Sequence, residues 1–438
     1  MLLCTTLLSI QSAYAMDLHE ALTSAYQTNE SLKAAQQKFL NEAENFPQAL
    51  SRFLPDINMT ISSNAQKDTV TERGPSTSRN LQVKQNLFRG GQDAYGIKVA
   101  QAAFLQSKAT FYAAEQKVIT DSAGAYLDLC AVKEKYNIAV TAVESAKQTL
   151  DMVQERLKVG ESTITEVAAT EAKYAKAESD AATQYGALVS AKANFSVLIG
   201  VEASDDIAFP DIEKNGIPDN LDALKAMVEK GNFDLMTAKS QLSQTKDGAK
   251  QAQGALLPSA ELTVSEGKNF ASTNGEPTIN TRSVSTAVSL TIPILDRGGI
   301  VHSAIRQKKA QSRQAVYILD YQKKQVNSAV ISEWESLHAM KVAIQSYDEI
   351  VRAQTLAVEG MRSGYSVGTQ TILDVLEQQD KLNQYKAQAV DARNQYLKSS
   401  YKLQALVGKM TAKQLNLKVK YFNPDYEFRN VKHKIVGF

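Results

Sequence analysis

The chain is 438 residues long, with 43% hydrophobic and 22% charged residues, and its 49 basic side chains nearly balance its 47 acidic ones. A formal net charge of +2 provides no concentrated basic field of the kind that nucleic-acid-binding proteins carry. Mean hydropathy is −0.29, and beyond the N-terminus no run approaches the ~20 apolar residues of a membrane-spanning helix. The composition therefore excludes a polytopic helical membrane protein, and we expect no nucleic-acid partner.

The first fifteen residues have the pattern of a secretory signal. The run Leu2–Ile10 is almost wholly apolar, and Ala13-Tyr14-Ala15 has the small-x-small pattern of a cleavage site. The alternative is a buried N-terminal helix. Cleavage after residue 15 would leave Cys130 as the only cysteine of the mature chain, so no intrachain disulfide is expected in an oxidising compartment.

Two short strands are predicted next, over about 56–66 and 79–88. Apolar and polar residues alternate along both, as in Ile57, Met59 and Ile61, which is the period of a strand with two different faces. The polar link 67–78 contains Gly-Pro and predicts an exposed loop. Each predicted strand is about ten residues long, the length that crosses a bilayer when tilted. The alternative is a soluble sheet with one dry face.

One very long helix follows, and then a tight turn and a returning helix. Residues 92–159 contain no proline and would extend about 100 Å at ~1.5 Å per residue. Gly160 marks the turn, and Thr163-Ile164-Thr165-Glu166-Val167 opens the returning helix.

The second half of the chain repeats this order. Strands are predicted over about 259–268 and 282–294, joined by an exposed loop over 267–280. Val159-Gly160 is matched by Val367-Gly368, and Leu198-Ile199-Gly200 by Leu406-Val407-Gly408, both at an offset of 208 residues. Gly368 therefore marks the second helix turn, and the chain is predicted to be a tandem duplication.

Apolar residues recur every seventh position in all four predicted helices, which is the period of a coiled-coil seam. The same offset of 208 relates the members of the two halves. These positions are Leu129, Tyr136, Val143, Leu150 and Leu157 with Leu337, Ile344, Val351, Val358 and Tyr365, and then Val167, Tyr174, Ala181, Leu188 and Phe195 with Val375, Leu382, Ala389, Tyr396 and Leu403.

These patterns divide the chain into four parts. Residues 1–15 are the signal, 16–218 the first helix–strand–strand–helix repeat, 219–408 the second repeat, and 409–438 a C-terminal segment expected at the equator of the helical part. The fold class is mainly α with membrane β-strands. Four strands cannot close a barrel, and lipid does not tolerate open sheet edges, so we expect an oligomer that completes one. A conduit needs about twelve strands or more.

Three motifs give the chain a family resemblance. They are Asp17–Leu22 at the start of the mature chain, Leu87-Phe88-Arg89-Gly90-Gly91 after the second strand, and the run Gly364–Leu376 around the second turn. Together with the duplicated repeat, these residues resemble the TolC family of outer-membrane efflux channels over nearly the whole mature chain.

The resemblance implies an assembly and a set of partners. It implies a homotrimer in the outer membrane, with a twelve-stranded barrel shared by the protomers and a long helical tunnel in the periplasm. The partners implied are a periplasmic adaptor protein, an inner-membrane pump of ABC, RND or MFS type, and outer-membrane lipid. The expected function is a passive exit duct for tripartite efflux or type I protein secretion, with no cofactor, and the exported cargo stays open.

The resemblance also implies an entrance gate at the helix turns. Tyr365 matches the family's gate tyrosine, and Glu166 stands at the position of its acidic partner. Asp374 and Glu377 match a ring of acids, and Gln370 stands where the family archetype has arginine. The contact that this arginine makes in the closed gate of the family archetype is therefore expected to differ in this chain.

The acid ring also has a physical argument of its own. Asp374 and Glu377 are three residues apart on one helical face, so that several copies around an axis would concentrate negative charge and favour cations. The alternative is that acids at a helix start only complement the helix dipole.

No catalytic or metal site is expected. Gly364-Tyr365-Ser366-Val367-Gly368 fits the G-x-S-x-G pattern of a hydrolase nucleophile, but a heptad helix precedes it where that motif requires a strand. The four histidines are scattered without metal-ligand spacing, and no phosphate-binding or dinucleotide motif occurs. The sequence predicts a protein that is not an enzyme. The alternative functions are a periplasmic adaptor, which has one helical hairpin, or a coiled-coil scaffold.

Overall fold

The computed structural model describes residues 16–64, 73–204, 206–211, 218, 220–273, 276–294, 297–432 and 434. The predicted signal at 1–15 lies outside these residues. The chain divides into two compact units. The first is formed by Met1–Ala35, Tyr112–Phe233 and Lys324–Tyr421, and the second by Gln36–Phe111, Asp234–Lys323 and Phe422–Phe438.

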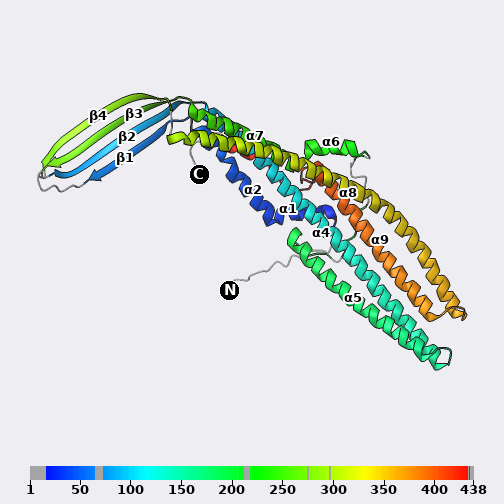
Figure 1. The fold of residues 1–438 in the computed structure, drawn as a ribbon. Coiled ribbons are helices and arrows are strands. Elements are labelled where there is room, and N and C mark those ends of the chain that lie inside the picture. Colours follow the sequence, from blue (N-terminus) through cyan, green and yellow to red (C-terminus); the bar gives the residue numbers. More distant parts are fainter. Residues whose placement is uncertain are drawn as a thin grey trace, which may run out of the picture. The chain divides into compact units, whose positions relative to one another are not determined.

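The described residues are mainly helical, with one four-stranded sheet (Figure 1). No helix among them is long and apolar enough to cross a membrane. The predicted long helices and their returning helices are present, and each pair has the same lengths, 67 and 36 residues. The helices are α1 (Leu18–Thr28), α2 (Glu30–Ala43), α3 (Asn45–Ser51), α4 (Gln92–Lys158), α5 (Ile164–Ile199), α6 (Leu221–Gly231), α7 (Phe233–Gln253), α8 (Ile300–Ser366), α9 (Ile372–Val407) and α10 (Pro424–Lys432).

The sheet in the second unit is antiparallel throughout, with the strand order β1-β2-β3-β4. The strands are β1 (Asp56–Asn64), β2 (Arg73–Arg89), β3 (Ser259–Thr273) and β4 (Glu276–Thr291). The two hairpins of the repeats therefore pair with each other through β2 and β3, and in this chain β1 and β4 are the edges.

Three of the strands are longer than the sequence pattern predicted. β2, β3 and β4 have 17, 15 and 16 residues instead of about ten. The predicted loops over 67–78 and 267–280 were wrong where the structure describes them, because residues 73–78, 267–273 and 276–280 belong to strands. These segments are rich in serine, threonine and asparagine and show no alternation of apolar and polar residues, so the sequence pattern did not predict strands. Pairing with the neighbouring strands keeps them extended. β4 also ends at Thr291 and not at 294, because Pro293 cannot donate to the ladder.

The register gives the sheet two chemically different faces. Residues directly opposite each other share a face, and the pairs Met59–Leu81, Val83–Val264 and Leu262–Val288 place apolar side chains together. We call this the apolar face. The other face, which we call the polar face, carries most of the serine, threonine and asparagine residues, for example Ser62 and Ser78, whose hydroxyl oxygens are 2.6 Å apart.

An aromatic cluster forms the helical core of the second unit. The rings of Phe104 and Phe428 stack with centroids 3.8 Å apart, and Phe46 meets Phe428 edge-on at 5.2 Å. Phe422 contacts Phe39 and Phe111 in the same cluster, at 5.8 and 4.9 Å. The C-terminal residues 422–432 are thus fixed to α2, α3 and the start of α4.

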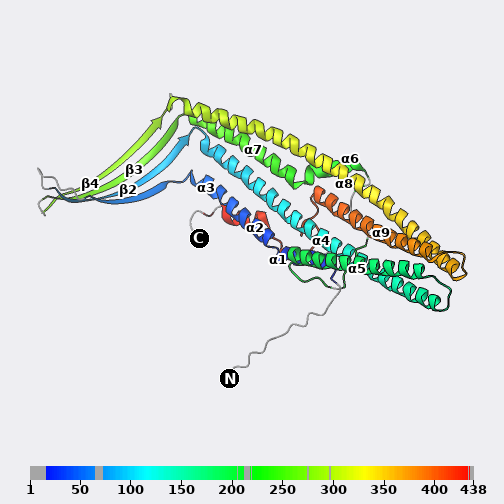
Figure 2. The ribbon, with the colours of Figure 1, turned by 60° about the horizontal axis from the view of Figure 1, so that its bottom comes forward.

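In the first unit, α5 lies along α4 and α9 lies along α8, in both views (Figures 1 and 2). All twenty residues of the predicted seven-residue repeat are buried or half-buried, so the seams face neighbouring helices as expected. The two returning helices contact each other as well.

Equivalent hydrogen bonds end the two returning helices. The side-chain amide of Asn29 donates to the Leu198 carbonyl at 3.3 Å, and that of Asn232 donates to the Leu406 carbonyl at 3.1 Å. The two acceptors are separated by the offset of 208 residues. The duplication therefore extends to individual polar contacts.

Candidate functional site at the two helix turns

Both helix turns have the same backbone hydrogen bonds. In the first, the Gly160 amide donates to Leu157 at 3.1 Å and the Glu161 amide donates to Arg156 at 2.8 Å. In the second, the amides of Gly368 and Thr369 donate to the carbonyls of Tyr365 and Gly364, at 3.1 and 2.9 Å. This pair of bonds is the Schellman motif, which satisfies carbonyls at a helix C-terminus.

The two glycines are required by backbone conformation. Gly160 and Gly368 have φ of +79° and +80°, in the left-handed region that side chains rarely adopt. A Cβ atom added at either position would meet nothing within 4 Å. The turns therefore depend on the flexibility of glycine and not on its small size.

Glu166 and Asp374 each cap the start of their own helix. The Thr163 amide donates to Glu166 at 3.0 Å and the Thr371 amide donates to Asp374 at 3.1 Å, completing a capping box in each repeat. The Ser162 hydroxyl also donates to Glu166, and this bond is the largest cause of a lowered pKa of that carboxyl. The Thr371 hydroxyl lowers the pKa of Asp374 in the same way.

Among the described residues, the Tyr365 and Glu166 side chains form no hydrogen bond with each other. The Tyr365 hydroxyl is buried without a hydrogen-bond partner, and the Glu166 carboxylate is already engaged by Ser162 and Thr163. Within the chain the Glu166 carboxylate is engaged at its own helix start, and its role as the acidic partner of Tyr365 at the gate stays a prediction. This engagement is local, because the carboxylate satisfies the nearest unpaired amide at its own helix start.

Tyr365 is instead part of a small apolar cluster. Its side chain is only 7% exposed and packs with Val153 of α4 and with Ile372, Val375 and Leu376 of α9. The tyrosine thus joins the end of one hairpin to the other, and it does so by packing.

Sequence reasoning missed Arg156. Its guanidinium lies over the Tyr365 ring, 4.6 Å from the ring centroid, and its charge contributes to the lowered pKa of Glu166. The offset of 208 aligns Arg156 with Gly364 and Leu157 with Tyr365, which shows that the repeats differ here but gives no sign of the contact. The two turns share a backbone and differ at these two positions.

Glu377 and Gln370 have separate surroundings. Glu377 lies one turn along α9 from Asp374, is exposed, and forms an ion pair with Lys381 at 2.7 Å. Gln370 is exposed, and its Cγ lies so close to Gly364 that a Cβ there would be 2.7 Å from it. Neither Glu377 nor Gln370 belongs to the described apolar cluster around Tyr365.

Ion pairs connect α9 to the first hairpin. Lys135 of α4 pairs with Asp391 at 2.5 Å, and Lys173 of α5 pairs with Asp380. Further along, Lys398 meets Asp128 of α4 at 2.6 Å. A partly exposed pair contributes little singly, but together these pairs set the register of α9 against α4 and α5.

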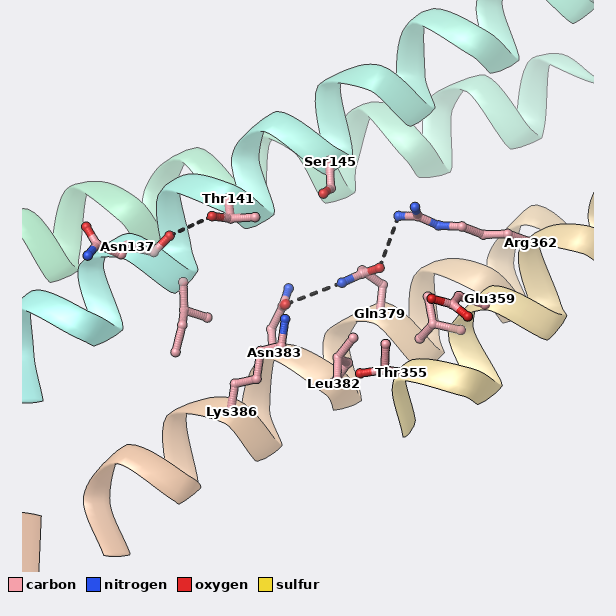
Figure 3. Close-up of a pocket in the computed structure, with 12 residues that line it drawn as sticks. Asn137, Thr141, Ser145, Thr355, Glu359, Arg362, Gln379, Leu382, Asn383 and Lys386 are labelled. Carbon is pink, nitrogen blue, oxygen red and sulfur yellow. Dashed lines mark hydrogen bonds between the residues drawn. The ribbon is translucent and has the colours of Figure 1, made fainter. Parts of the chain in front are cut away.

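An open groove of about 360 Å³ lies between α4, α8 and α9 (Figure 3). Gln379 stands at its centre, accepting a hydrogen bond from Arg362 at 3.1 Å and donating to Asn383 at 3.4 Å. Its lining is mixed polar and apolar. Among the described residues, no group of three His, Cys, Asp or Glu side chains could hold a metal ion.

A family model for outer membrane efflux proteins matches residues 21–201 and 226–409. The chain belongs to the outer membrane efflux protein family. Efflux protein BepC of Brucella suis is 26% identical over 436 residues, covering 100% of this chain and 95% of BepC. TolC of Escherichia coli is 26% identical over 393 residues, covering 85% of this chain and 78% of TolC.

The fold is also that of a solved structure. The outer membrane protein VceC of Vibrio cholerae superimposes with a TM-score of 0.77 at 18% identity, covering 89% of this chain and 96% of VceC. The family model matches the chain in two separate segments. As a member of the outer membrane efflux protein family, the protein is an outer-membrane transport channel of the TolC type and not an enzyme.

Proposed function

We propose that the protein works as a homotrimer, in which three four-stranded sheets close one twelve-stranded barrel and the helical hairpins form a passive exit duct in the periplasm. The observation that carries this proposal is the sheet. It has one apolar and one polar face, and its outer strands β1 and β4 have no further partner in the described chain. A bilayer does not tolerate such edges, and pairing β4 of one copy with β1 of the next removes all of them.

The two faces fit a wall between lipid and water. The apolar face would meet lipid, and residues such as Ile57, Met59 and Val288 are 63 to 69% exposed in the single chain. The polar face would line the lumen with hydroxyl and amide groups, which suits a water-filled channel. Twelve strands leave room for such a lumen, whereas eight would be filled by side chains.

The contacts within the described chain favour a link between the hairpins other than the one that the family resemblance implies. We assign the link between the two hairpins to Arg156 and Tyr365, which are in contact, and not to Glu166 or Gln370. Asp374 and Glu377 would form the acid ring, three copies of each around the axis, although Lys381 offsets part of the charge of Glu377.

A pair of matched substitutions tests the membrane wall. Val288 and Ser289 are neighbours on β4 and lie on opposite faces of the sheet. Val288→Arg places a charge toward lipid near the middle of the apolar face, at a cost of roughly 2–4 kcal/mol, whereas Ser289→Arg points into water. We expect Val288→Arg to lose outer-membrane recovery as a heat-labile trimer, and Ser289→Arg to retain it with altered single-channel conductance.

Equal recovery of the two variants would contradict the assignment of the faces. A protein recovered as a soluble periplasmic monomer would contradict the trimer and favour the adaptor or scaffold function. A periplasmic adaptor and an inner-membrane pump are proposed as partners. Deletion of the gene, followed by comparison of secreted proteins and drug susceptibility, decides whether the cargo is protein or small molecule.

A further inference from the structure

Three basic side chains lie in one cross-strand row of the apolar face. Arg79 of β2 is directly opposite Lys268 of β3, and Lys268 is directly opposite Arg282 of β4. We call these three residues the basic row. All three are exposed. Neighbouring strands are about 4.8 Å apart, so three like charges stand side by side, an arrangement that destabilises a sheet unless an anion offsets it.

The chain itself supplies little compensation. Among the described residues of the basic row and the two rows that flank it on this face, the one acid is Glu266, which pairs with Arg282 at 2.8 Å. Arg79 lies over the ring of Phe270, 5.9 Å from its centroid, an interaction that orients the guanidinium but adds no negative charge. The basic row and Glu266 together therefore carry an excess of positive charge.

The row also lies at one boundary of the apolar face. Arg282 is ten positions before Ile292, the apolar residue that follows β4, and Val284, Val288 and Leu290 on this face are exposed between them. Ten residues extend about 34 Å along a strand, or about 26 Å along the membrane normal at a tilt of about 40°, close to the ~25 Å apolar band of outer-membrane barrels. The basic row would thus lie where hydrocarbon meets headgroups.

The direction of the strands identifies the leaflet. α4 follows the end of β2 near Arg89, and α8 follows the end of β4 near Thr291, so both helices leave the sheet at the end opposite to the basic row. With the helices in the periplasm, the basic row faces the outer leaflet. This step rests on the proposed function.

We propose that the basic row binds the phosphate groups of a phosphorylated glycolipid of the outer leaflet. The apolar rows below it would contact the acyl chains, and Arg79, Lys268 and Arg282 would contact the phosphates. Arginine binds phosphate through two parallel hydrogen bonds, and this mode distinguishes a phosphate monoester from an uncharged sugar.

The test compares lipids on the purified, detergent-solubilised protein. Native mass spectrometry measures the binding of lipid A, which carries phosphates, of dephosphorylated lipid A, and of phosphatidylglycerol. The triple variant Arg79→Gln, Lys268→Gln, Arg282→Gln is compared with a matched control, Lys308→Gln, Lys309→Gln, Arg313→Gln, which removes the same charge from α8. We expect the triple variant to bind lipid A about a hundredfold more weakly, since each basic residue contributes about one kcal/mol to anionic lipid binding.

Two outcomes would overturn the inference. One is equal lipid A affinity of the triple variant and the wild type, and the other is equal affinity of the wild type for lipid A and its dephosphorylated form. The second measurement needs no variant and stands if the triple variant does not fold. Channel conductance of the wild type in bilayers without lipid A is measured in parallel. Its absence contradicts the proposed function, whereas its presence together with either outcome above contradicts only the lipid site.

Discussion

The two helix turns of the molecule have the same pattern of backbone hydrogen bonds but differ in side-chain packing. Gly160 and Gly368 have the same φ, and the capping boxes that follow them are the same. At the two positions before each turn, however, the first repeat has Arg156-Leu157 and the second has Gly364-Tyr365. The duplicated backbone is thus maintained by local rules, whereas the contact of the Arg156 guanidinium with the Tyr365 ring is made by two residues that each occur in only one repeat.

The largest effect is expected from removing the packing residue. Tyr365→Ala leaves a cavity among Val153, Ile372 and Val375, at a cost of roughly 3–5 kcal/mol. Hydrogen exchange at the second turn should rise, and channel conductance should rise with it. Tyr365→Phe is the matched control. Because the hydroxyl has no partner in the described chain, we expect wild-type exchange, and strong deprotection would show that the hydroxyl makes a hydrogen bond.

Substitution of the two glycines tests the left-handed backbone conformation that the two turns share. Gly160→Ala and Gly368→Ala should each destabilise their turn by about 1–2 kcal/mol, because both place a Cβ in the left-handed region. The two costs should be equal, since neither Cβ would contact a neighbour. Hydrogen exchange of residues 156–167 and 364–375 measures them. A clear inequality would mean that one glycine is also packed against another group.

Arg156→Ala tests the contact that crosses from one turn to the other. Loss of the guanidinium over the Tyr365 ring should weaken the second turn by about 0.5–1 kcal/mol, although the substitution lies in the first. It should also raise the pKa of Glu166, which the arginine charge helps to lower. Arg156→Lys controls for charge. Exchange that rises only in the first turn would contradict the link.

Acid should affect both turns in the same direction. The folded-state pKa values of Glu166 and Asp374 lie below their ordinary values of 4.5 and 3.8, so each carboxylate stabilises its helix start above those pH values. This stabilisation is lost as the pH falls below them and through the lowered values. NMR or hydrogen exchange should show that fraying at the starts of α5 and α9 increases as the pH falls. Because an amide does not titrate, this pH dependence should be lost from α5 in Glu166→Gln and from α9 in Asp374→Asn. Fraying with the same pH midpoint in both variants would exclude the caps as its cause.

Much of the fold could be predicted because it follows from local patterns. Seven-residue spacing located the seams of α4, α5, α8 and α9, and the duplicated glycines located the turns. The extra length of β2, β3 and β4 could not be predicted, since serine and threonine beyond the apolar rows are extended only because a neighbouring strand pairs with them.

The contacts of the candidate site are less local than the patterns that predict the fold. Family likeness identified Tyr365 as a residue of the turn, but its neighbour depends on how α4 meets α9, which no local pattern encodes. Glu166 matches the acidic partner of the gate tyrosine by position, and the structure adds that its carboxylate caps its own helix. Arg156 looked like an ordinary charge near a helix end, and only the three-dimensional contact with Tyr365 distinguishes it.

The unpaired edges of β1 and β4 have a further consequence for biogenesis. A newly exported protomer would cross an aqueous compartment with two unpaired strand edges and an uncovered apolar face. Any other exposed strand could pair with these edges in place of the correct partner. Correct assembly must therefore outpace aggregation, and both depend on protomer concentration. Overproduction raises the protomer concentration and should therefore increase aggregation. We expect the yield of assembled channel to fall while the stability of the trimers that do form is unchanged.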